Sequence, residues 1–158
     1  NDLKLDWFSV DDALVELTGT LSGIAFAFDI TLVVGLTGLI MGIAASLSMA
    51  GSAYFEAKEN PSEDINPLIY SLYTGVSYIL TTTILVVPFF IFETMAYSLI
   101  MMFISAFLAI ISYNFYISVA KDLSFSKRVI QMSAITFGVA LISFAIGYVV
   151  KFYFGIEI

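Results

Sequence analysis

The sequence predicts an all-α integral membrane protein, a single domain in which five transmembrane helices form one bundle. Hydrophobic residues make up 60% of the 158-residue chain and charged residues 12%, whereas soluble domains are nearer half apolar and a quarter charged. The mean hydropathy is +0.99. Five apolar segments are each long enough to cross about 30 Å of hydrocarbon as a helix. Strands of a membrane barrel would need only about ten residues each.

The five segments cover residues 11–28, 31–57, 67–87, 94–120 and 127–154. The start of the first segment overlaps Ser9-x-x-Asp12, a pattern typical of a helix N-terminus. The third opens with Pro67, as the first turn of a helix tolerates. The first segment is too acidic for a signal peptide and lacks a cleavage pattern. Near the predicted interfaces lie aromatic residues of the kind that anchor helices in membranes, namely Trp7, Tyr148 and Tyr153.

The basic residues predict the orientation. With five spans, the N-terminus and the second and fourth loops share one side, which holds Lys4, Lys58, Lys121, Lys127 and Arg128. The other side holds only Lys151. The positive-inside rule therefore places the N-terminus in the cytoplasm.

Composition also excludes several functions. The chain has no cysteine and no histidine, so disulfides, thiolate or imidazole metal ligands and histidine general bases are excluded. A net charge of −7 without a basic stripe disfavours nucleic acid as a partner. We find no nucleophile–base pair and no cofactor motif, and therefore expect neither an enzyme nor a bound cofactor.

The most informative residue is Glu16, because a carboxylate inside a membrane helix costs roughly 2.5–3.5 kcal/mol on the insertion scale. Helical spacing puts Asp12, Glu16, Thr20 and Gly23 on one stripe. In the second segment, Met49 and Glu56 share a face. Carboxylate oxygens with a thioether suit a divalent first-row metal such as Fe²⁺. We expect Asp12, Glu16 and Met49 to line a metal pathway.

Each of these residues has a simpler explanation. Asp12 could cap its helix, Glu16 could be a buried hydrogen-bonded carboxyl, and Met49 could fill the core. Asp11, one residue off the stripe, is expected to be a solvated acid of the first helical turn. At the cytoplasmic end of the second segment lie acids that form either a metal entry or a solvated loop, namely Glu56, Glu59, Glu63 and Asp64.

Small residues predict where helices touch. Gly19-x-x-x-Gly23 lies in the first segment, and Gly38-x-x-x-Gly42 lies in the second and continues through Ser46 and Ala50. Such rows let backbones approach closely in lipid. They predict either packing of the first segment on the second within one chain, or a dimer interface at Gly19 and Gly23.

Two of these motifs resemble the vacuolar iron transporter family. They are Asp12-Ala-Leu-Val-Glu-Leu-Thr-Gly-Thr-Leu-Ser-Gly23 and Gly42-Ile-Ala-Ala-Ser-Leu-Ser-Met-Ala-Gly-Ser-Ala-Tyr-Phe-Glu-Ala-Lys58. Pro67, Pro88 after the third span, and the region from Gly138 to Gly147 also fit. The resemblance implies a five-helix homodimer that moves Fe²⁺, and often Mn²⁺, out of the cytosol in exchange for protons. By motif, the family's pathway aspartate and methionine fall on Asp12 and Met49, and Glu16 fits a prokaryotic variant.

One departure from the family concerns the connection between the second and third spans. Vacuolar-type members carry a long acidic helical insert there, where this chain has only residues 59–66. The resemblance therefore implies a prokaryotic-type member in a cell membrane. The alternative function is a membrane anchor or oligomerisation module of a larger metal-handling protein, without transport, in which the acids hold helices together.

Overall fold

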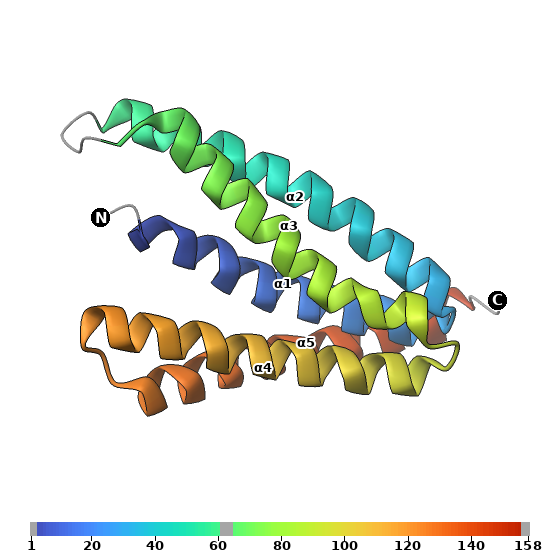
Figure 1. Ribbon diagram of the computed structural model, residues 1–158. Coiled ribbons are helices and arrows are strands. Elements are labelled where there is room, and N and C mark those ends of the chain that lie inside the picture. The colour runs from blue at the N-terminus through green and yellow to red at the C-terminus, as the bar shows by residue number, and fades with distance from the viewer. Residues whose placement is uncertain (1–2, 61–64, 156–158) are drawn as a thin grey trace.

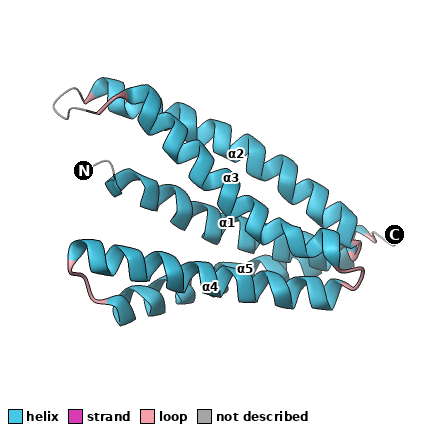
Figure 2. Ribbon diagram, viewed as in Figure 1, coloured by secondary structure: helices cyan, strands magenta, loops and turns pink. Residues whose placement is uncertain are grey.

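The computed structural model describes residues 3–60 and 65–155, with side chains from residue 9 onward, and the described part of the chain is built of five helices. They are α1 (Leu3–Phe28), α2 (Thr31–Glu59), α3 (Pro67–Ile91), α4 (Met95–Lys121) and α5 (Phe125–Phe154) (Figures 1 and 2). The predicted all-α class is confirmed. Among the described residues, four helices, α2 to α5, are long and apolar enough to cross a membrane. That finding makes the chain a plausible multi-pass membrane protein.

Helix α1 is the central element of the bundle. It contacts each of the other four helices, and its most extensive packing is against α5. Helix α2 packs mainly against α3. In Figure 1, α1 lies between the α2–α3 pair and the α4–α5 pair. The central position explains why this helix, although it carries Asp11, Asp12 and Glu16, is buried along much of its length.

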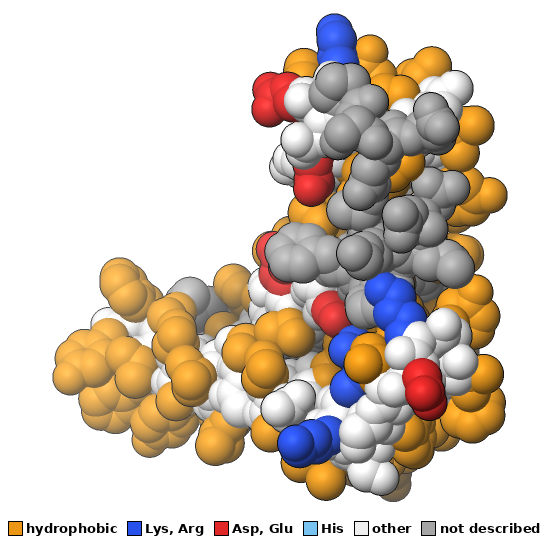
Figure 3. Space-filling view, turned by 90° about the vertical axis from the view of Figure 1, so that its left-hand side faces the viewer, with side chains coloured by type: hydrophobic (Ala, Val, Ile, Leu, Met, Phe, Trp, Pro, Cys, Tyr) orange, Lys and Arg blue, Asp and Glu red, His pale blue; other side chains and the backbone are white. Residues whose placement is uncertain are grey.

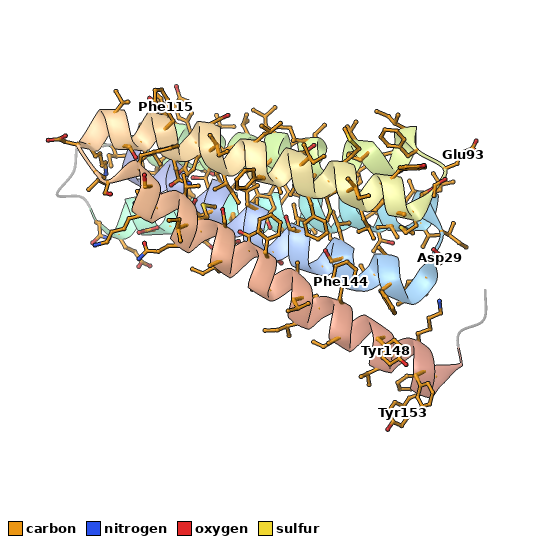
Figure 4. The ribbon with its side chains drawn as sticks, turned by 90° about the horizontal axis from the view of Figure 1, so that it is seen from below. Asp29, Glu93, Phe115, Phe144, Tyr148 and Tyr153 are labelled. Atoms are coloured by element: carbon orange, nitrogen blue, oxygen red, sulfur yellow. The ribbon has the colours of Figure 1, made fainter. Side chains whose placement is uncertain are left out.

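Charged residues gather at both ends of the bundle. The N-terminus, the α2–α3 connection and the α4–α5 connection lie at one end (Figure 1), together with Lys58, Lys121 and Lys127. Figure 3 views this end and shows Lys and Arg as well as Asp and Glu side chains on it. Asp29 and Glu93 lie at the opposite end, where the C-terminal part of α5 diverges from the bundle and carries Tyr148 and Tyr153 (Figure 4).

The start of the first helix was predicted wrongly. Helix α1 begins at Leu3, eight residues before the predicted start at residue 11. The Ser9 hydroxyl does not cap the helix; it donates a 2.9 Å hydrogen bond to the backbone carbonyl of Thr74 on α3. Because Asp12 lies well inside α1, the capping explanation for Asp12 is excluded.

The other predicted bounds differ less. Helix α2 ends at Glu59 rather than residue 57, α4 and α5 shift by one or two residues at their starts, and α3 continues to Ile91. Pro88 therefore lies inside α3 rather than after it. Proline has no backbone N–H to donate within the helix. The carbonyl oxygen of Pro88 lies 3.3 Å from the Ser98 hydroxyl of α4.

The core forms where the apolar face of α1 meets α3 and α4. Leu14, Leu17 and Leu21 of α1 are fully buried, as are Leu85 of α3 and Met102 of α4. Large apolar side chains also cover the outer faces of the bundle, as a lipid environment requires. Examples are Ile40, Leu47, Leu72, Val119, Ile130, Leu141 and Phe152, each more than half exposed.

The glycine rows bring helices together within the chain. A Cβ added at Gly19 would lie 2.6 Å from Val139 Cγ1, and one at Gly23 would lie 2.9 Å from the Ser143 carbonyl oxygen, so both glycines face α5. Gly42 faces Thr82 of α3. Gly38 faces both Leu21 of α1 and Val86 of α3, so α1 and α2 meet at Gly38 but not at Gly19 or Gly23.

Candidate functional site on helix α1

The predicted acidic stripe lies on one side of α1. Asp12 is half-buried and Glu16 is exposed. Their carboxyl groups are close enough to interact electrostatically, since residues four apart are neighbours on a helix surface. Ala13, Leu14 and Leu17, which lie between and beside them in sequence, are buried on the opposite side. Helical periodicity thus turns two carboxylates away from the core of their own chain.

A tyrosine holds the second carboxylate. The Tyr78 hydroxyl of α3 donates a 2.9 Å hydrogen bond to Glu16 Oε2. Tyr78 is completely buried and belongs to the core. A buried phenol needs a hydrogen-bond partner, and here the partner is a carboxylate 62 residues away in sequence. This contact fixes the Glu16 carboxylate relative to α3.

The segment of α3 that precedes Tyr78 packs against α2. One turn before Tyr78, a Cβ added at Gly75 would lie 3.2 Å from Ala50 Cβ of α2. The Ser71 hydroxyl donates a 2.7 Å hydrogen bond to the Ala50 carbonyl oxygen. Because the Ser9 hydroxyl of α1 bonds the Thr74 carbonyl next to Gly75, the part of α2 that carries Met49 lies closer to the level of Ser9 and Asp12 than to that of Glu16.

Met49 itself is half-buried and packs against the hydrophobic core. This packing is what the core-filling explanation expects. A half-buried thioether is also compatible with a ligand, because the sulfur of a flexible side chain can adopt several positions. Its role as a metal ligand therefore stays a prediction.

The acids of the proposed entry are only partly described. Glu56 and Glu59 are both exposed in the last turns of α2, close to Lys58, whose ammonium lies 5.9 Å from the centre of the Tyr54 ring. Glu63 and Asp64 lie outside the described residues. Exposure of the first two agrees with a solvated acidic end, and the entry role stays a prediction.

The sequence did not single out Tyr78, although one signal was present. A tyrosine in the interior of an apolar span needs a partner for its hydroxyl, and the nearest acids in other segments were candidates. Asp11 was described wrongly as a solvated acid. It is half-buried, its Oδ1 is buried, and it lines a pocket with Arg128 of α5.

Within the described part of the chain, the acids of one copy do not assemble a metal centre. Among the residues that the structure describes, no three Asp or Glu side chains are grouped so as to hold a metal ion. Asp12 and Glu16 provide two carboxylates, and a third oxygen donor has to come from water, from a backbone carbonyl or from another chain.

The chain matches no protein-family model and no curated protein. The resemblance to vacuolar iron transporters therefore depends on the two motifs in α1 and α2, and stays a prediction.

Proposed function

We propose that the protein is a homodimeric membrane transporter of the vacuolar iron transporter type, which exports Fe²⁺, and also Mn²⁺, from the cytosol in exchange for protons. Helix α1 would also cross the membrane, in addition to the four apolar helices α2 to α5. The observation that carries the proposal is the exposed Glu16 carboxylate, held by Tyr78, in the centre of a bundle with apolar flanks. A carboxylate in contact with lipid is costly, so its exposed side requires water, an ion or another chain.

A second copy of the chain would satisfy this requirement. In the end view of Figure 3 the chain has an L-shaped outline with a concave side, and acidic side chains are visible at the inner corner. Two copies related by a two-fold axis would present the same surface to each other. Asp12 and Glu16 from each copy would then supply four carboxylates around one path, enough oxygen donors for a divalent cation.

Exchange with protons would use the same carboxylates. Close carboxylates repel each other when all are ionised, so in the absence of metal they compete for protons. A divalent cation that enters the site displaces those protons. Coupling of metal export to proton import needs only that the two kinds of ligand bind the same carboxylates alternately. Tyr78 would orient Glu16 during both halves of the cycle.

Met49 would provide selectivity. Oxygen ligands alone accept Mg²⁺ and Ca²⁺, whereas a thioether favours softer first-row ions. A site without imidazole or thiolate ligands would bind its ion weakly enough to release it, as transport requires. The basic residues at the end that carries the N-terminus support a cytoplasmic position for this end. The short connection between α2 and α3 supports a prokaryotic-type member in a cell membrane.

The rival function is a membrane anchor that does not transport. The hydrogen bond between Tyr78 and Glu16 supports the anchor function, because polar pairs of this kind join helices in lipid. In that case Glu16 would be a structural carboxyl, and metal ions would not cross the membrane.

Flux measurements separate the two functions. Purified protein is reconstituted into vesicles that contain a metal-sensitive dye and a pH-sensitive dye, and Fe²⁺ or Mn²⁺ is added outside, with and without an imposed pH gradient. We expect metal entry above that of protein-free vesicles, faster when the interior is acidic, and accompanied by a rise of the internal pH. Metal entry equal to that of protein-free vesicles, with protein shown to be folded and inserted, would favour the anchor.

A further inference from the structure

A second polar site lies on the other side of α1. A pocket of about 200 Å³ opens between α1, α4 and α5. Its lining includes Asp11 of α1, Asn114 of α4, and Arg128, Gln131 and Met132 of α5. Since one residue turns a helix by about 100°, Asp11 faces away from the stripe of Asp12 and Glu16. The pocket is therefore separate from the proposed metal path.

The pocket carries one charge of each sign. The Asp11 Oδ1 atom is buried and has no hydrogen-bond partner in the structure, although the carboxylate senses the charge of Arg128. The Arg128 Nε donates a 3.1 Å hydrogen bond to Asn114 Oδ1. Asn114 is fully buried and donates to the Ile110 carbonyl oxygen at 2.8 Å. The guanidinium is thus oriented by a buried amide, whereas the carboxylate offers an unsatisfied acceptor.

These charges select the class of ligand. A metal cation would face the Arg128 guanidinium, and a simple anion would face the Asp11 carboxylate. A small zwitterion can place its cationic group against Asp11 and its anionic group against Arg128. A volume of about 200 Å³ is enough for a small headgroup.

The position of the pocket indicates the source of such a zwitterion. Arg128 lies in the first turn of α5, at the end of the bundle that also holds Lys121 and Lys127. Helix α5 has 30 residues and is about 45 Å long, more than the ~30 Å hydrocarbon layer. Its first turn can therefore lie at the level of the lipid headgroups.

The outer face of α5 continues from the pocket as an apolar track. Ile135 lines the pocket and is 58% exposed. One turn further, a Cβ at Gly138 would meet nothing within 4 Å, and Ile142 beyond it is 63% exposed. An acyl chain that leaves the pocket could lie along this track.

We propose that the pocket binds a zwitterionic aminophospholipid, with the primary ammonium of the headgroup on Asp11 and its phosphate on Arg128. This inference does not depend on the transport proposal, since a membrane anchor could bind the same lipid. The primary ammonium matters because it supplies N–H donors to the Asp11 carboxylate, which a trimethylated headgroup cannot do.

Native mass spectrometry of the purified full-length protein tests the proposal. The protein is incubated with equal amounts of phosphatidylethanolamine, its mono- and dimethylated forms, phosphatidylcholine and phosphatidylglycerol, all with the same acyl chains. We expect phosphatidylethanolamine to be retained roughly tenfold more than phosphatidylcholine, with a stepwise fall along the methylation series. Equal retention across that series in the wild-type protein would overturn the proposal without any mutation.

Matched variants then locate the binding site. Asp11→Asn keeps the shape and should abolish the preference for phosphatidylethanolamine over phosphatidylcholine, whereas Arg128→Gln should weaken retention of both lipids. The controls are Asp122→Asn and Lys127→Gln, which change exposed charges at the same end of the bundle and should have no effect. Unchanged lipid selectivity in folded Asp11→Asn protein would contradict the assignment.

One further arm distinguishes a lipid from a soluble ligand. Phosphoethanolamine without acyl chains, at millimolar concentration, should not displace the bound lipid, because it cannot use the apolar track on α5. Displacement at this concentration would show that the pocket takes its ligand from water, and would overturn the lipid assignment.

Discussion

The hydroxyl of Tyr78 lies 2.9 Å from Glu16 Oε2 and joins α3 to α1 near the middle of the chain's most central helix. Tyr78 is completely buried, whereas Glu16 is exposed on the other side of the contact. The pair therefore connects the core with the surface on which the metal path is proposed. A change at either residue should therefore alter metal flux more strongly than it alters the stability of the fold.

Replacement of Glu16 by glutamine tests the titratable charge. The amide oxygen of Glu16→Gln can still accept from the Tyr78 hydroxyl, so the thermal stability in detergent should stay close to that of the wild type. Proton movement driven by metal should be abolished in vesicles. Asp122→Asn, which removes an exposed acid outside the stripe, should leave flux unchanged. Normal proton-coupled flux in Glu16→Gln would remove Glu16 from the mechanism.

Removal of the Tyr78 hydroxyl tests the orientation of the carboxylate. Polar contacts between helices in membranes contribute about 0.6 kcal/mol on average, so Tyr78→Phe should lower the free energy of unfolding only slightly. Metal flux should nevertheless fall strongly, because Glu16 loses the contact that fixes its position. The exposed Tyr73 of α3 supplies the control, Tyr73→Phe. Wild-type flux in Tyr78→Phe would assign the hydrogen bond to folding alone.

Selectivity is expected to depend on the sulfur of Met49. Met49→Leu conserves volume and should cost less than about 1.5 kcal/mol in packing. Fe²⁺ flux measured against excess Mg²⁺ should decrease, because only the softer ion gains from a thioether. Met102→Leu, at a fully buried core position, should leave the ratio of the two fluxes unchanged. The same ratio in Met49→Leu as in the wild type would mean that Met49 only packs.

The contact between α1 and α5 should be sensitive to one methyl group. A Cβ added at Gly147 would collide with the backbone carbonyl of Gly23, which cannot move without a shift of the helix. We expect Gly147→Ala to destabilise the protein by about 1–3 kcal/mol, measured by thermal unfolding in detergent. At Gly138 an added Cβ meets nothing within 4 Å, so Gly138→Ala should be neutral or stabilising by up to ~1 kcal/mol. Similar melting temperatures for both variants would show that α1 and α5 are not packed this closely.

Cross-linking tests the proposed dimer. Thr20 is half-buried on the stripe of Glu16, and in a two-fold dimer about α1 a cysteine at this position should cross-link two chains. Gly23 is unsuitable, since its added Cβ would lie 2.9 Å from the Ser143 carbonyl oxygen of the same chain. The comparison is Ile104→Cys on the outer face of α4, where Ile104 is 46% exposed. Cross-linking through Ile104 but not through Thr20 would place the axis elsewhere.

The sequence by itself determined the class of the fold and the acidic stripe. Apolar segments separated by short polar stretches locate helices, and the 3.6-residue period places Asp12 and Glu16 on one side of α1 without knowledge of any other helix. The start of α1 was missed because Lys4 and Asp6 interrupt the apolar pattern. The helix nevertheless extends through them, because the described residues before Ser9 include neither proline nor glycine.

Only the tertiary structure decided which residues meet across helices. Periodicity shows the direction in which a side chain leaves its own helix, but not which helix lies there. It could not show that Tyr78 reaches Glu16, that Gly19 and Gly23 face α5 rather than α2, or that Asp11 shares a pocket with Arg128. These pairs depend on the order in which five similar apolar helices pack around α1. That order is decided by the close fit of small and large side chains between helices, which no single segment of the sequence contains.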